Sequence, residues 1–356
     1  MRVLVRTDSS VKIGIGHVMR CLTLSRGLRE SGVDVEFICR NHKGNIIDRI
    51  LEDGFFVHIL ELKSSHIKDS ESQYSNWLST TQSEDAAECK KAISNSEVDW
   101  LIVDHYAISE DWHITLKPHC KKIMVIDDLA NRRHFCDLLL DQTFGRNLED
   151  YQGLVPSSCR MLLGSQYALI HPDFIQWRQF GLKRREKFDT CRLLINMGGA
   201  DNDNFTGKVL SLIPQCDLPI NMEIVVVMGA TFPHLSEIER LAGLLPFKIE
   251  LLVNVHNMAE IMAHSDIAIG APGSTTWERC CLGLPSILFV QAENQMLIAK
   301  NMEEEGGALV LNDGKNLCRA LHEFSDKSYY NKMSKTCSKI VDGLGLDRIL
   351  NLLLGS

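Results

Sequence analysis

The chain has 356 residues, of which 45% are hydrophobic and 24% are charged. This length and balance are typical of a globular protein with two domains of ordinary size, each able to bury its own core. The formal net charge of −8 argues against nucleic acid or a membrane as the main partner, because both demand clustered positive charge. A small anionic ligand is compatible with it, since helix ends act at contact distance.

The cysteine pattern and the N-terminus bear on the compartment. Twelve cysteines are scattered between Cys21 and Cys337 without a C-x-x-C pair or a regular spacing, so neither a zinc site nor a disulfide framework is expected. The chain starts with a strand-like run and not with a charged leader, and it has no run of about 18 apolar residues. We expect a cytoplasmic protein.

The first half alternates short apolar runs with helical patterns. Runs that are apolar on both faces predict a buried parallel sheet. Helical patterns cover residues 18–28 and 46–51 and stop at Gly32 and Gly54. Residues 61–84 are polar and predict a surface loop. The predicted strands are Val3–Val5, Val35–Cys39, Phe55–Leu60, Trp100–Val103, Ile123–Ile126 and Leu138–Leu140.

The alternation stops and then restarts. Residues 171–189 hold the charge run Lys183–Lys187 and no clear apolar period, so we interpret them as a linker between domains at 1–170 and 190–356. The pattern predicts an α/β protein of two Rossmann-like, doubly wound domains with an interdomain cleft, and makes the last helix a candidate to pack back on the N-terminal domain. The later strands are predicted at Leu193–Ile195, Glu223–Val227, Ile249–Leu252, Ile267–Ile269 and Ile287–Val290, and the clearest helices at Asn257–His264 and Thr275–Leu282.

A glycine-rich loop with a histidine follows the first predicted strand. Gly14, Gly16 and His17 stand where a helix should begin, and free backbone N–H groups at a helix start attract anions. An imidazole can also take up a proton near neutral pH, which indicates chemistry on a phosphorylated ligand. A tight turn with a packing histidine would give the same pattern. The spacing is not G-x-G-x-x-G, so no nicotinamide or flavin cofactor is predicted.

A second such turn follows the strand at Ile267–Ile269. Gly273 precedes Ser274, a good N-cap residue, and the first helical turn would then contain Thr275, Thr276 and Glu278. The N–H groups would face a phosphate, and the Glu278 carboxylate would lie about one turn away, where sugar hydroxyls of a nucleotide would be. An ordinary capped helix, with Glu278 complementing the dipole, is the alternative.

Further polar residues follow predicted strands. The turn at Gly198–Gly199, the pair Asp104 and Tyr106, and the run Glu293–Gln295 all fall at strand ends, where open parallel sheets bind ligands. Asp104 could equally cap the next element. Clustered carboxylates could hold Mg²⁺, but no Walker lysine loop accompanies them, so no metal is expected. The carboxylates in question are those of Asp127, Asp128 and Asp141.

Taken together, these motifs resemble one enzyme family. The order and approximate separations are similar, from Met1 to about Asn312, to the UDP-2,4-diacetamido-2,4,6-trideoxy-β-L-altropyranose hydrolases of pseudaminic acid biosynthesis. The resemblance rests on Ile13–Cys21, Val103–Tyr106, Ile126–Ala130, Asp137–Gln142, Gly198–Asp201, Gly273–Glu278 and Glu293–Gln295.

The resemblance implies a GT-B fold related to the MurG glycosyltransferases and hydrolysis of that UDP-sugar to UDP and the free sugar. It implies that His17 is the catalytic base and that Asn294 helps to hold the attacking water. It implies a small-molecule UDP-sugar as the partner. Together with the net charge and the absence of a Walker loop, the expectation is no cofactor, no metal, no nucleic acid and no membrane, and a monomer is one possibility because the sequence does not give the oligomeric state. The residues expected to bind substrate or UDP are Gly14, Gly16, Arg20, Asp104, Tyr106, Gly199, Gly273, Ser274, Thr275, Thr276, Glu278 and Gln295.

Two positions depart from the family pattern. Pro272 stands where relatives commonly have a second glycine, and it removes a backbone donor, so phosphate contacts would begin at Gly273. His171 stands where arginine would be expected, which leaves a contact to the sugar or the hinge in doubt.

The chemistry needs fewer groups than an ordinary glycosidase, which uses two carboxyls. A diphosphate can depart as an anion that helix N-termini stabilise, so only a base for water is missing, and His17 fits. We therefore hypothesise attack of water at C1 with C–O cleavage and inversion. A GT-B glycosyltransferase using the same UDP clamp, a hydrolysing 2-epimerase and a non-catalytic nucleotide-sugar binding module are the alternatives.

Overall fold

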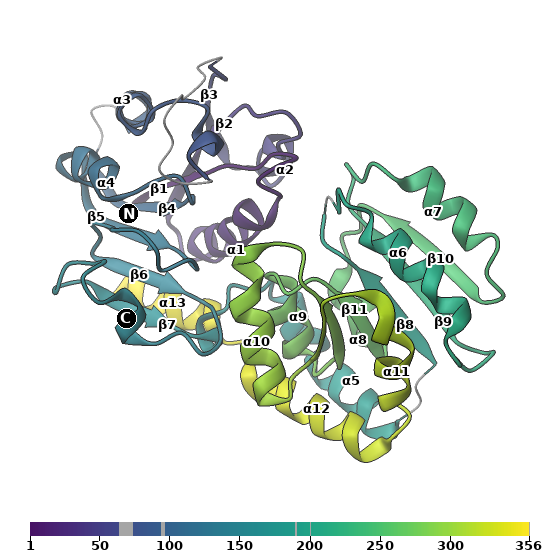
Figure 1. Ribbon diagram of the computed structural model, residues 1–356. Helices are drawn as coiled ribbons and strands as arrows, with labels where there is room; N and C mark the ends of the chain where they lie inside the picture. The colour runs from purple at the N-terminus through teal and green to yellow at the C-terminus, as the bar shows by residue number, and fades with distance from the viewer. Residues whose placement is uncertain (64–73, 94–96, 189–190, 200, 356) are drawn as a thin grey trace. The chain divides into compact units, whose positions relative to one another are not determined.

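The computed structural model describes residues 1–63, 74–93, 97–188, 191–199 and 201–355, and the chain forms two compact units (Figure 1). Unit 1 comprises Met1–Leu169 together with the segment that begins at Gly345. Unit 2 is continuous from Ile170 to Leu344. The chain therefore passes from one unit to the other twice.

Unit 1 is built on a seven-stranded parallel sheet of order β3-β2-β1-β4-β5-β6-β7. Its strands are β1 (Arg2–Thr7), β2 (Asp34–Arg40), β3 (Phe56–Leu60), β4 (Val98–Asp104), β5 (Cys120–Ile126), β6 (Leu138–Asp141) and β7 (Arg160–Leu163). Its helices are α1 (Gly16–Glu30), α2 (Ile47–Glu52), α3 (Gln82–Ile93), α4 (Glu110–Leu116) and α13 (Gly345–Leu354), with short 3-10 turns η1 (Ser75–Leu78), η2 (Lys117–His119), η3 (Leu148–Tyr151) and η4 (Ser165–Tyr167).

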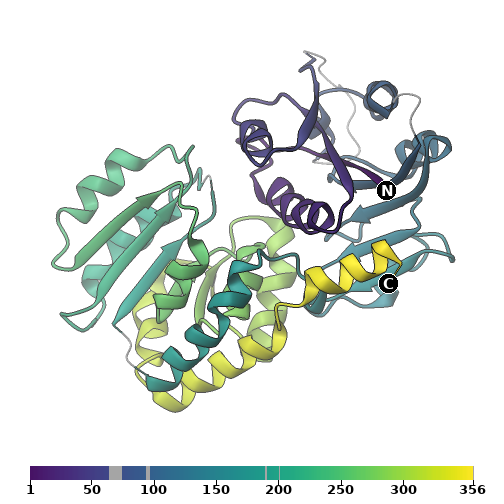
Figure 2. The same ribbon diagram turned by 180° about the vertical axis from the view of Figure 1, so that it is seen from behind.

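Successive residues of the central strands feed two cores, one on each face of this sheet. Val3 and Val5 pack with α1, α2 and α13, whereas Leu4 points to the other face and packs with α3 and α4. Figure 2 shows α13 and α1 on the same face of the sheet, and Gly27 of α1 gives room for the side chain of Leu350. The β1–β4 pairing, with Thr7 opposite Asp104, brings two strand ends together.

Unit 2 repeats the plan with a six-stranded parallel sheet of order β10-β9-β8-β11-β12-β13. Its strands are β8 (Arg192–Asn196), β9 (Glu223–Met228), β10 (Lys248–Val253), β11 (Ile267–Gly270), β12 (Ser286–Phe289) and β13 (Leu309–Leu311). Its helices are α5 (Asp173–Lys187), α6 (Phe205–Leu212), α7 (Leu235–Ala242), α8 (Met258–His264), α9 (Thr275–Cys281), α10 (Met296–Glu305), α11 (Leu317–Glu323) and α12 (Lys327–Ile340), with 3-10 turns η5 (Ile213–Gln215), η6 (Glu293–Gln295) and η7 (Gly314–Asn316).

Both sheets have the doubly wound order, so the predicted class of two Rossmann-like α/β domains is confirmed. The pattern missed β7 and β13, which are short edge strands with few fully buried positions. Residues 61–84, expected as a surface loop, contain η1 and the start of α3, and residues 64–73 of that prediction lie outside the described residues.

Residues 171–189, which we predicted to be a linker, contain the 15-residue helix α5 of unit 2. An apolar period does not reveal this helix, because its buried face includes Gly181 and Arg185. The Arg185 guanidinium donates to the backbone carbonyls of Met262 (2.8 Å) and Ser265 (3.0 Å), so a charged residue occupies a core position. Residues 189–190 lie outside the described residues.

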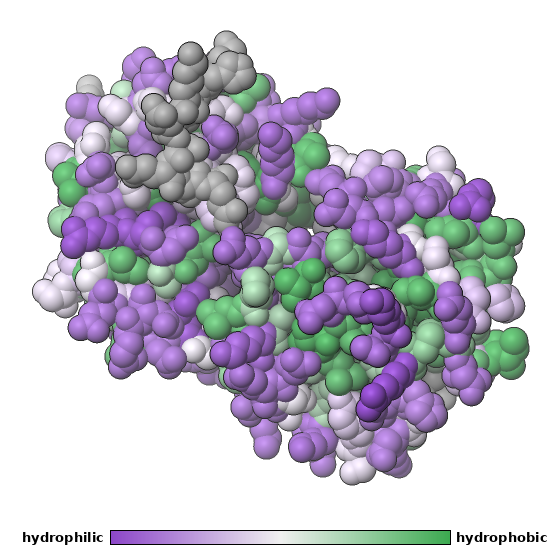
Figure 3. All heavy atoms as spheres, in the orientation of Figure 1, coloured by the Kyte–Doolittle hydropathy of each residue, from purple (hydrophilic) through white to green (hydrophobic). Residues whose placement is uncertain are grey.

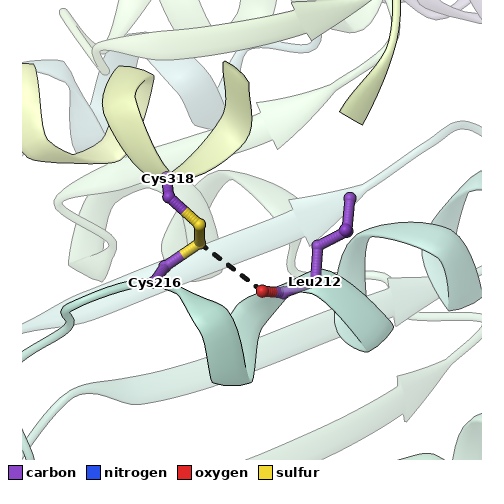
Figure 4. The surroundings of a disulfide bond; sticks show 3 residues. All are labelled: Leu212, Cys216 and Cys318. Atoms are coloured by element: carbon purple, nitrogen blue, oxygen red, sulfur yellow. Dashed lines mark hydrogen bonds between the residues drawn. A yellow bond between two sulfur atoms is a disulfide. The ribbon is translucent and has the colours of Figure 1, made fainter. Parts of the chain in front are cut away.

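No disulfide framework is predicted from the sequence, and the described residues contain one disulfide bond that the cysteine pattern does not indicate. Cys216, which follows η5, is bonded to Cys318 of α11 (Figure 4). The two cysteines are 102 positions apart, so no local spacing announces the pair. The bond joins the residue after η5 to α11, with Cys216 buried and Cys318 half-buried.

On the face drawn in Figure 3, hydrophobic residues form separate groups among hydrophilic ones. Within the described ranges, no helix has the length and apolar character needed to cross a bilayer.

Candidate functional site

The loop between β1 and α1 is an ordered turn. The Ser10 hydroxyl accepts from the backbone N–H of Lys12 (3.1 Å) and Ile13 (2.9 Å), and the Gly14 N–H donates to the Ser10 carbonyl (2.9 Å). Gly14 has φ +79°, a conformation that favours glycine, and no described atom lies within 4 Å of the position a Cβ would take. The turn thus needs Gly14 for its backbone, and the space beside it is open to a ligand.

The first backbone N–H groups of α1 are not capped by a side chain. This helix, described in full, has neither a side-chain cap at Ile15 nor an acidic residue in its first turn. Gly16 is its first residue and His17 its second. The positive end of the helix dipole is therefore left for an external anion.

His17 is paired with Asp104 at the end of β4. The Nδ1 atom of His17 lies 2.6 Å from Oδ1 of Asp104. An ionised carboxylate can only accept, so Nδ1 carries a proton, and in the neutral form of the ring Nε2 has the lone pair. Burial alone would raise the pKa of Asp104, but the Arg20 guanidinium and His17 outweigh it and hold that pKa well below its usual range. The pair therefore fixes the orientation of the His17 ring, and Nε2 is the ring nitrogen that does not face Asp104.

Arg20 fixes this carboxylate from one turn further along α1. Its Nε and Nη2 atoms lie 2.6 and 2.7 Å from the two oxygens of Asp104, and Nη1 lies 3.0 Å from Asp128 Oδ2. We predicted that Asp104 and Arg20 bind the substrate. Asp104 has no exposed surface, and both of its oxygens are already engaged, so that assignment is corrected to positioning. Arg20 is almost as deeply buried and acts on the same carboxylate.

Aromatic rings stand beside the imidazole. Tyr106 meets the His17 ring edge-on with centroids 4.6 Å apart, and its hydroxyl donates to Oδ1 of Asp128. Trp77 of η1 stacks on Tyr106, with centroids 5.3 Å apart and the planes 21° from parallel. Sequence reasoning placed Tyr106 at the site but missed Trp77. The signal was the aromatic pair Tyr74 and Trp77 inside an otherwise polar stretch.

A buried ionic network lies beneath the loop. Arg6 bridges Asp8 (2.6 Å) at the end of β1 and Asp85 (2.7 Å) of α3, and Asp85 also accepts from Arg40 (2.8 Å). These side chains have no exposed surface. Burial would raise the pKa of Asp85, but Arg6 outweighs it and lowers that pKa to about 2. The network ties α3 to the strand end from which the glycine loop starts.

The other strand-end carboxylates are taken up by protein cations and hydroxyls. The Tyr151 hydroxyl lies 2.9 Å from Asp127 and 2.8 Å from Asp141, and Arg146 lies 2.5 Å from Asp141. Burial raises the pKa of Asp141 to about 6, although Arg146 opposes the shift. Across the described ranges, no three His, Cys, Asp or Glu side chains are grouped so that they could hold a metal ion.

In unit 2, the loop before α9 is only partly as expected. Ser274 occupies the N-cap position, but its backbone is helical and it forms no capping hydrogen bond within the described chain, which corrects the predicted cap. Thr276 is buried, and its hydroxyl accepts from Arg279 (3.1 Å), so its side chain serves the fold. Gly273, Ser274 and Thr275 are half-buried, and no described atom would meet a Cβ at Gly273. These three residues therefore keep exposed surface at the start of α9.

Glu278 stands on the same short helix. It is half-buried, and burial raises its pKa to about 7, partly offset by Arg279. A carboxylate with this pKa ionises around neutral pH and can then accept hydrogen bonds from the hydroxyls of a ligand.

The turn after β8 lies against the turn after β9. Gly198 has φ +95°, and a Cβ on Gly229 would stand 2.1 Å from the Gly199 carbonyl oxygen. Gly229 thus permits the close approach of the Gly199 carbonyl, and Asp201 beyond it accepts from the N–H groups of Phe205 and Thr206 at the start of α6.

Asn294 and Gln295 lie in η6, just after β12. Both side chains are half-buried. Oε1 of Gln295 accepts from the Gln291 N–H (2.9 Å), so this predicted ligand residue also closes its own loop.

A family model and several known proteins are similar to this chain. Residues 194–342 match the glycosyltransferase family 28 C-terminal domain, which covers the β11–α9 and η6 loops. The chain is 29% identical to a UDP-2,4-diacetamido-2,4,6-trideoxy-β-L-altropyranose hydrolase of Campylobacter jejuni, over 86% of its own length and 97% of that protein. The chain is a homologue of this hydrolase.

Two other relatives extend the comparison. A Bacillus subtilis spore coat polysaccharide biosynthesis protein is 24% identical, over 99% of this chain and 98% of that protein. An uncharacterized protein of Methanocaldococcus jannaschii is 28% identical over 83% of this chain, which spans only 57% of that relative's length.

Solved structures place the hydrolase homologue in the GT-B fold. MurG of Acinetobacter baumannii superposes with a TM-score of 0.70 at 13% identity, covering 100% of this chain and 99% of that one. The UDP-GlcNAc 2-epimerase of Neisseria meningitidis superposes with a TM-score of 0.62 at 12% identity, covering 100% of both chains. At such identities the likeness concerns the fold alone.

Proposed function

We propose that the protein hydrolyses a UDP-sugar of the 2,4-diacetamido-2,4,6-trideoxy-β-L-altropyranose type to UDP and the free sugar, in pseudaminic acid biosynthesis. The observation that carries the proposal is the His17–Asp104 pair, because it supplies a base in the correct tautomer beside an uncapped helix start. The homology to the Campylobacter hydrolase supports the substrate.

The proposed reaction is a single displacement at C1 of the sugar. Nε2 of His17 takes a proton from water while the water oxygen forms a bond to C1 of the sugar. The bond between C1 and the diphosphate oxygen breaks, and its electron pair leaves with UDP, so the configuration at C1 inverts. Asp104 stabilises the imidazolium that forms, as a buried carboxylate on Nδ1 does in other histidine bases.

We assign the binding of the nucleotide to residues 194–342, which match the glycosyltransferase family 28 C-terminal domain. Gly273, Ser274 and Thr275 would bind diphosphate oxygens, and Glu278 would accept from ribose hydroxyls. The helix start stabilises the negative charge that develops on the leaving group. Asn294, also in this domain, would help to hold the attacking water. No group in this scheme requires a metal or a cofactor.

A glycosyltransferase is the second candidate, supported by the family 28 match and the likeness to MurG. The same imidazole could deprotonate a sugar hydroxyl in place of water. In that case the UDP-sugar alone would be stable, and UDP would be released only with an acceptor present.

One experiment separates these reactions. The purified protein is incubated with UDP-trideoxyhexoses in ¹⁸O-water without an acceptor, and UDP and sugar are followed by NMR and mass spectrometry. We expect label in the free sugar and a loss of turnover in His17→Asn. Label in UDP would overturn C–O cleavage, and turnover of His17→Asn near the normal rate would overturn the base.

A further inference from the structure

Three aromatic side chains form what we call the aromatic wall of unit 1: Tyr74, Trp77 and Tyr106. Tyr74 meets Trp77 edge-on with centroids 4.8 Å apart and meets Tyr106 with centroids 5.0 Å apart. Trp77 stacks on Tyr106 and also points an edge at the His17 ring, 6.2 Å away. The wall therefore stands directly beside the proposed base.

The wall is tethered to the same ionic groups as the base. The Tyr106 hydroxyl donates to Asp128, and Asp128 accepts from Arg20, which in turn grips the Asp104 carboxylate of the His17 pair. Tyr106 is buried, whereas Trp77 is half-buried. A fixed inner ring thus supports an outer ring that retains exposed surface.

A sugar whose C1 is attacked by water activated at His17 would have to stand close to this aromatic surface, because the rings lie 4.6 and 6.2 Å from the imidazole. Ligand sites combine apolar and aromatic walls with a few convergent polar groups, and the wall with His17 has that composition. The face of an aromatic ring offers a large apolar surface to C–H and methyl groups, and that face does not hydrogen-bond a buried hydroxyl as a polar side chain would.

We propose that Trp77 is a specificity-determining residue that contacts the methyl groups of a deoxygenated, N-acetylated sugar. This inference rests on the proposed function. The Trp77 side chain would select against sugars with a free C6 hydroxyl. An apolar pocket distinguishes a methyl from a hydroxymethyl group by about 10- to 200-fold, which sets the size of the effect.

The test compares Trp77→Ala and Trp77→Phe with the unchanged protein on two substrates. These are a UDP-2,4-diacetamido-2,4,6-trideoxyhexose and a UDP-2-acetamidohexose with a C6 hydroxyl. We expect Trp77→Ala to raise KM for the trideoxy sugar by about 10- to 100-fold with kcat changed little, so that the preference between the sugars collapses. Trp77→Phe should restore part of the preference, and Trp177→Leu, on α5 of unit 2, is the matched control.

A packing role would give a different pattern. If Trp77→Ala and Trp77→Phe lower kcat for both sugars equally and leave their KM ratio unchanged, Trp77 positions His17 and the inference is overturned. A shifted pH profile of kcat without a change of preference would overturn it in the same way.

A binding measurement keeps this inference separate from the proposed function. Both UDP-sugars are titrated by calorimetry into His17→Asn and into His17→Asn with Trp77→Ala. If the unchanged protein hydrolyses neither sugar, the proposed function fails, and the binding preference still decides the role of Trp77. Loss of the preference supports it, and equal preferences in the two variants overturn it.

Discussion

Nδ1 of His17 and Oδ1 of Asp104 lie 2.6 Å apart, although the two residues are 87 positions apart in the chain. They meet because β1 and β4 are neighbours in the sheet, so α1 starts beside the end of β4. Parallel strands collect the residues that follow them at one sheet edge, and this edge is where such folds bind ligands.

Asp104→Asn tests the tautomer of His17. An amide can donate to Nδ1 and leave Nε2 protonated, so we expect hydrolysis to fall by about 10²- to 10⁴-fold. Removing the charge that Arg20 grips should also lower the free energy of unfolding by about 3 kcal/mol, measured in urea. Asp53→Asn, which removes a partner of Arg26 elsewhere in unit 1, is the control and should keep full activity. Normal turnover in Asp104→Asn would contradict the pairing.

Glu278 should make nucleotide binding depend on pH. Its pKa is raised to about 7, so the carboxylate is mostly protonated at pH 6 and mostly ionised at pH 8. If the ionised form accepts from ribose hydroxyls, the affinity for UDP should fall by up to about tenfold from pH 8 to pH 6 in calorimetry. Glu278→Gln should bind more weakly at pH 8 and show a flat profile; a profile like that of the unchanged protein would exclude this role.

The same carboxyl affects stability with the opposite sign to an ordinary ion-paired glutamate. Its folded-state pKa lies above the ordinary value of 4.5, so the folded state holds the proton more tightly than the unfolded chain. The free energy of unfolding should therefore fall as the pH rises from about 4.5 to about 7, and Glu278→Gln should remove that fall in urea titrations taken across this range. An equal slope in both proteins would contradict the raised pKa.

The Cys216–Cys318 bond should stabilise unit 2. It closes a long loop, with a sequence separation of 102, and bonds that close long loops typically contribute about 2–4 kcal/mol. We expect Cys216→Ser with Cys318→Ser to lower the free energy of unfolding by that amount, and mass spectrometry without reductant to detect the bond in the unchanged protein. Cys120→Ser, at a half-buried cysteine that is not disulfide-bonded, is the control. Equal stability of the double variant would argue against the bond.

Asp85 should be essential to unit 1. Its carboxylate accepts from Arg6 (2.7 Å), Arg40 (2.8 Å) and Nε1 of Trp112 (3.0 Å), so Asp85→Ala leaves buried cations without their partner and should cost about 3–5 kcal/mol. Glu88→Ala removes a more exposed partner of Arg40 and should cost less than about 1 kcal/mol in the same denaturation assay.

The pKa of Asp85 also predicts the pH range over which acid destabilises unit 1. Its pKa falls from 3.8 in an ordinary carboxyl to about 2 in the folded state, so its contribution to stability is complete above pH 3.8 and disappears as the pH falls through about 2. Acid unfolding followed by circular dichroism should show this loss in the unchanged protein and not in Asp85→Ala.

The sequence by itself determined the two βα alternations, most strand positions and the loops that need glycine. These features are local: a buried parallel strand must be apolar on both faces, and Gly14 and Gly198 adopt positive φ angles that other residues resist. The likeness to the hydrolase family also follows from the order of these motifs.

Only the tertiary structure decided what each polar side chain contacts. Asp104 and Arg20 were expected to bind the substrate, and strand order made them partners of His17 and of each other. Trp77 stacks on Tyr106 although it belongs to a segment that is mostly polar in sequence. Cys216 is bonded to Cys318 although the two are 102 positions apart, a distance over which no local sequence pattern predicts a pair. Such contacts depend on which strands are neighbours and which helices cover them, and a pattern of adjacent residues does not record either.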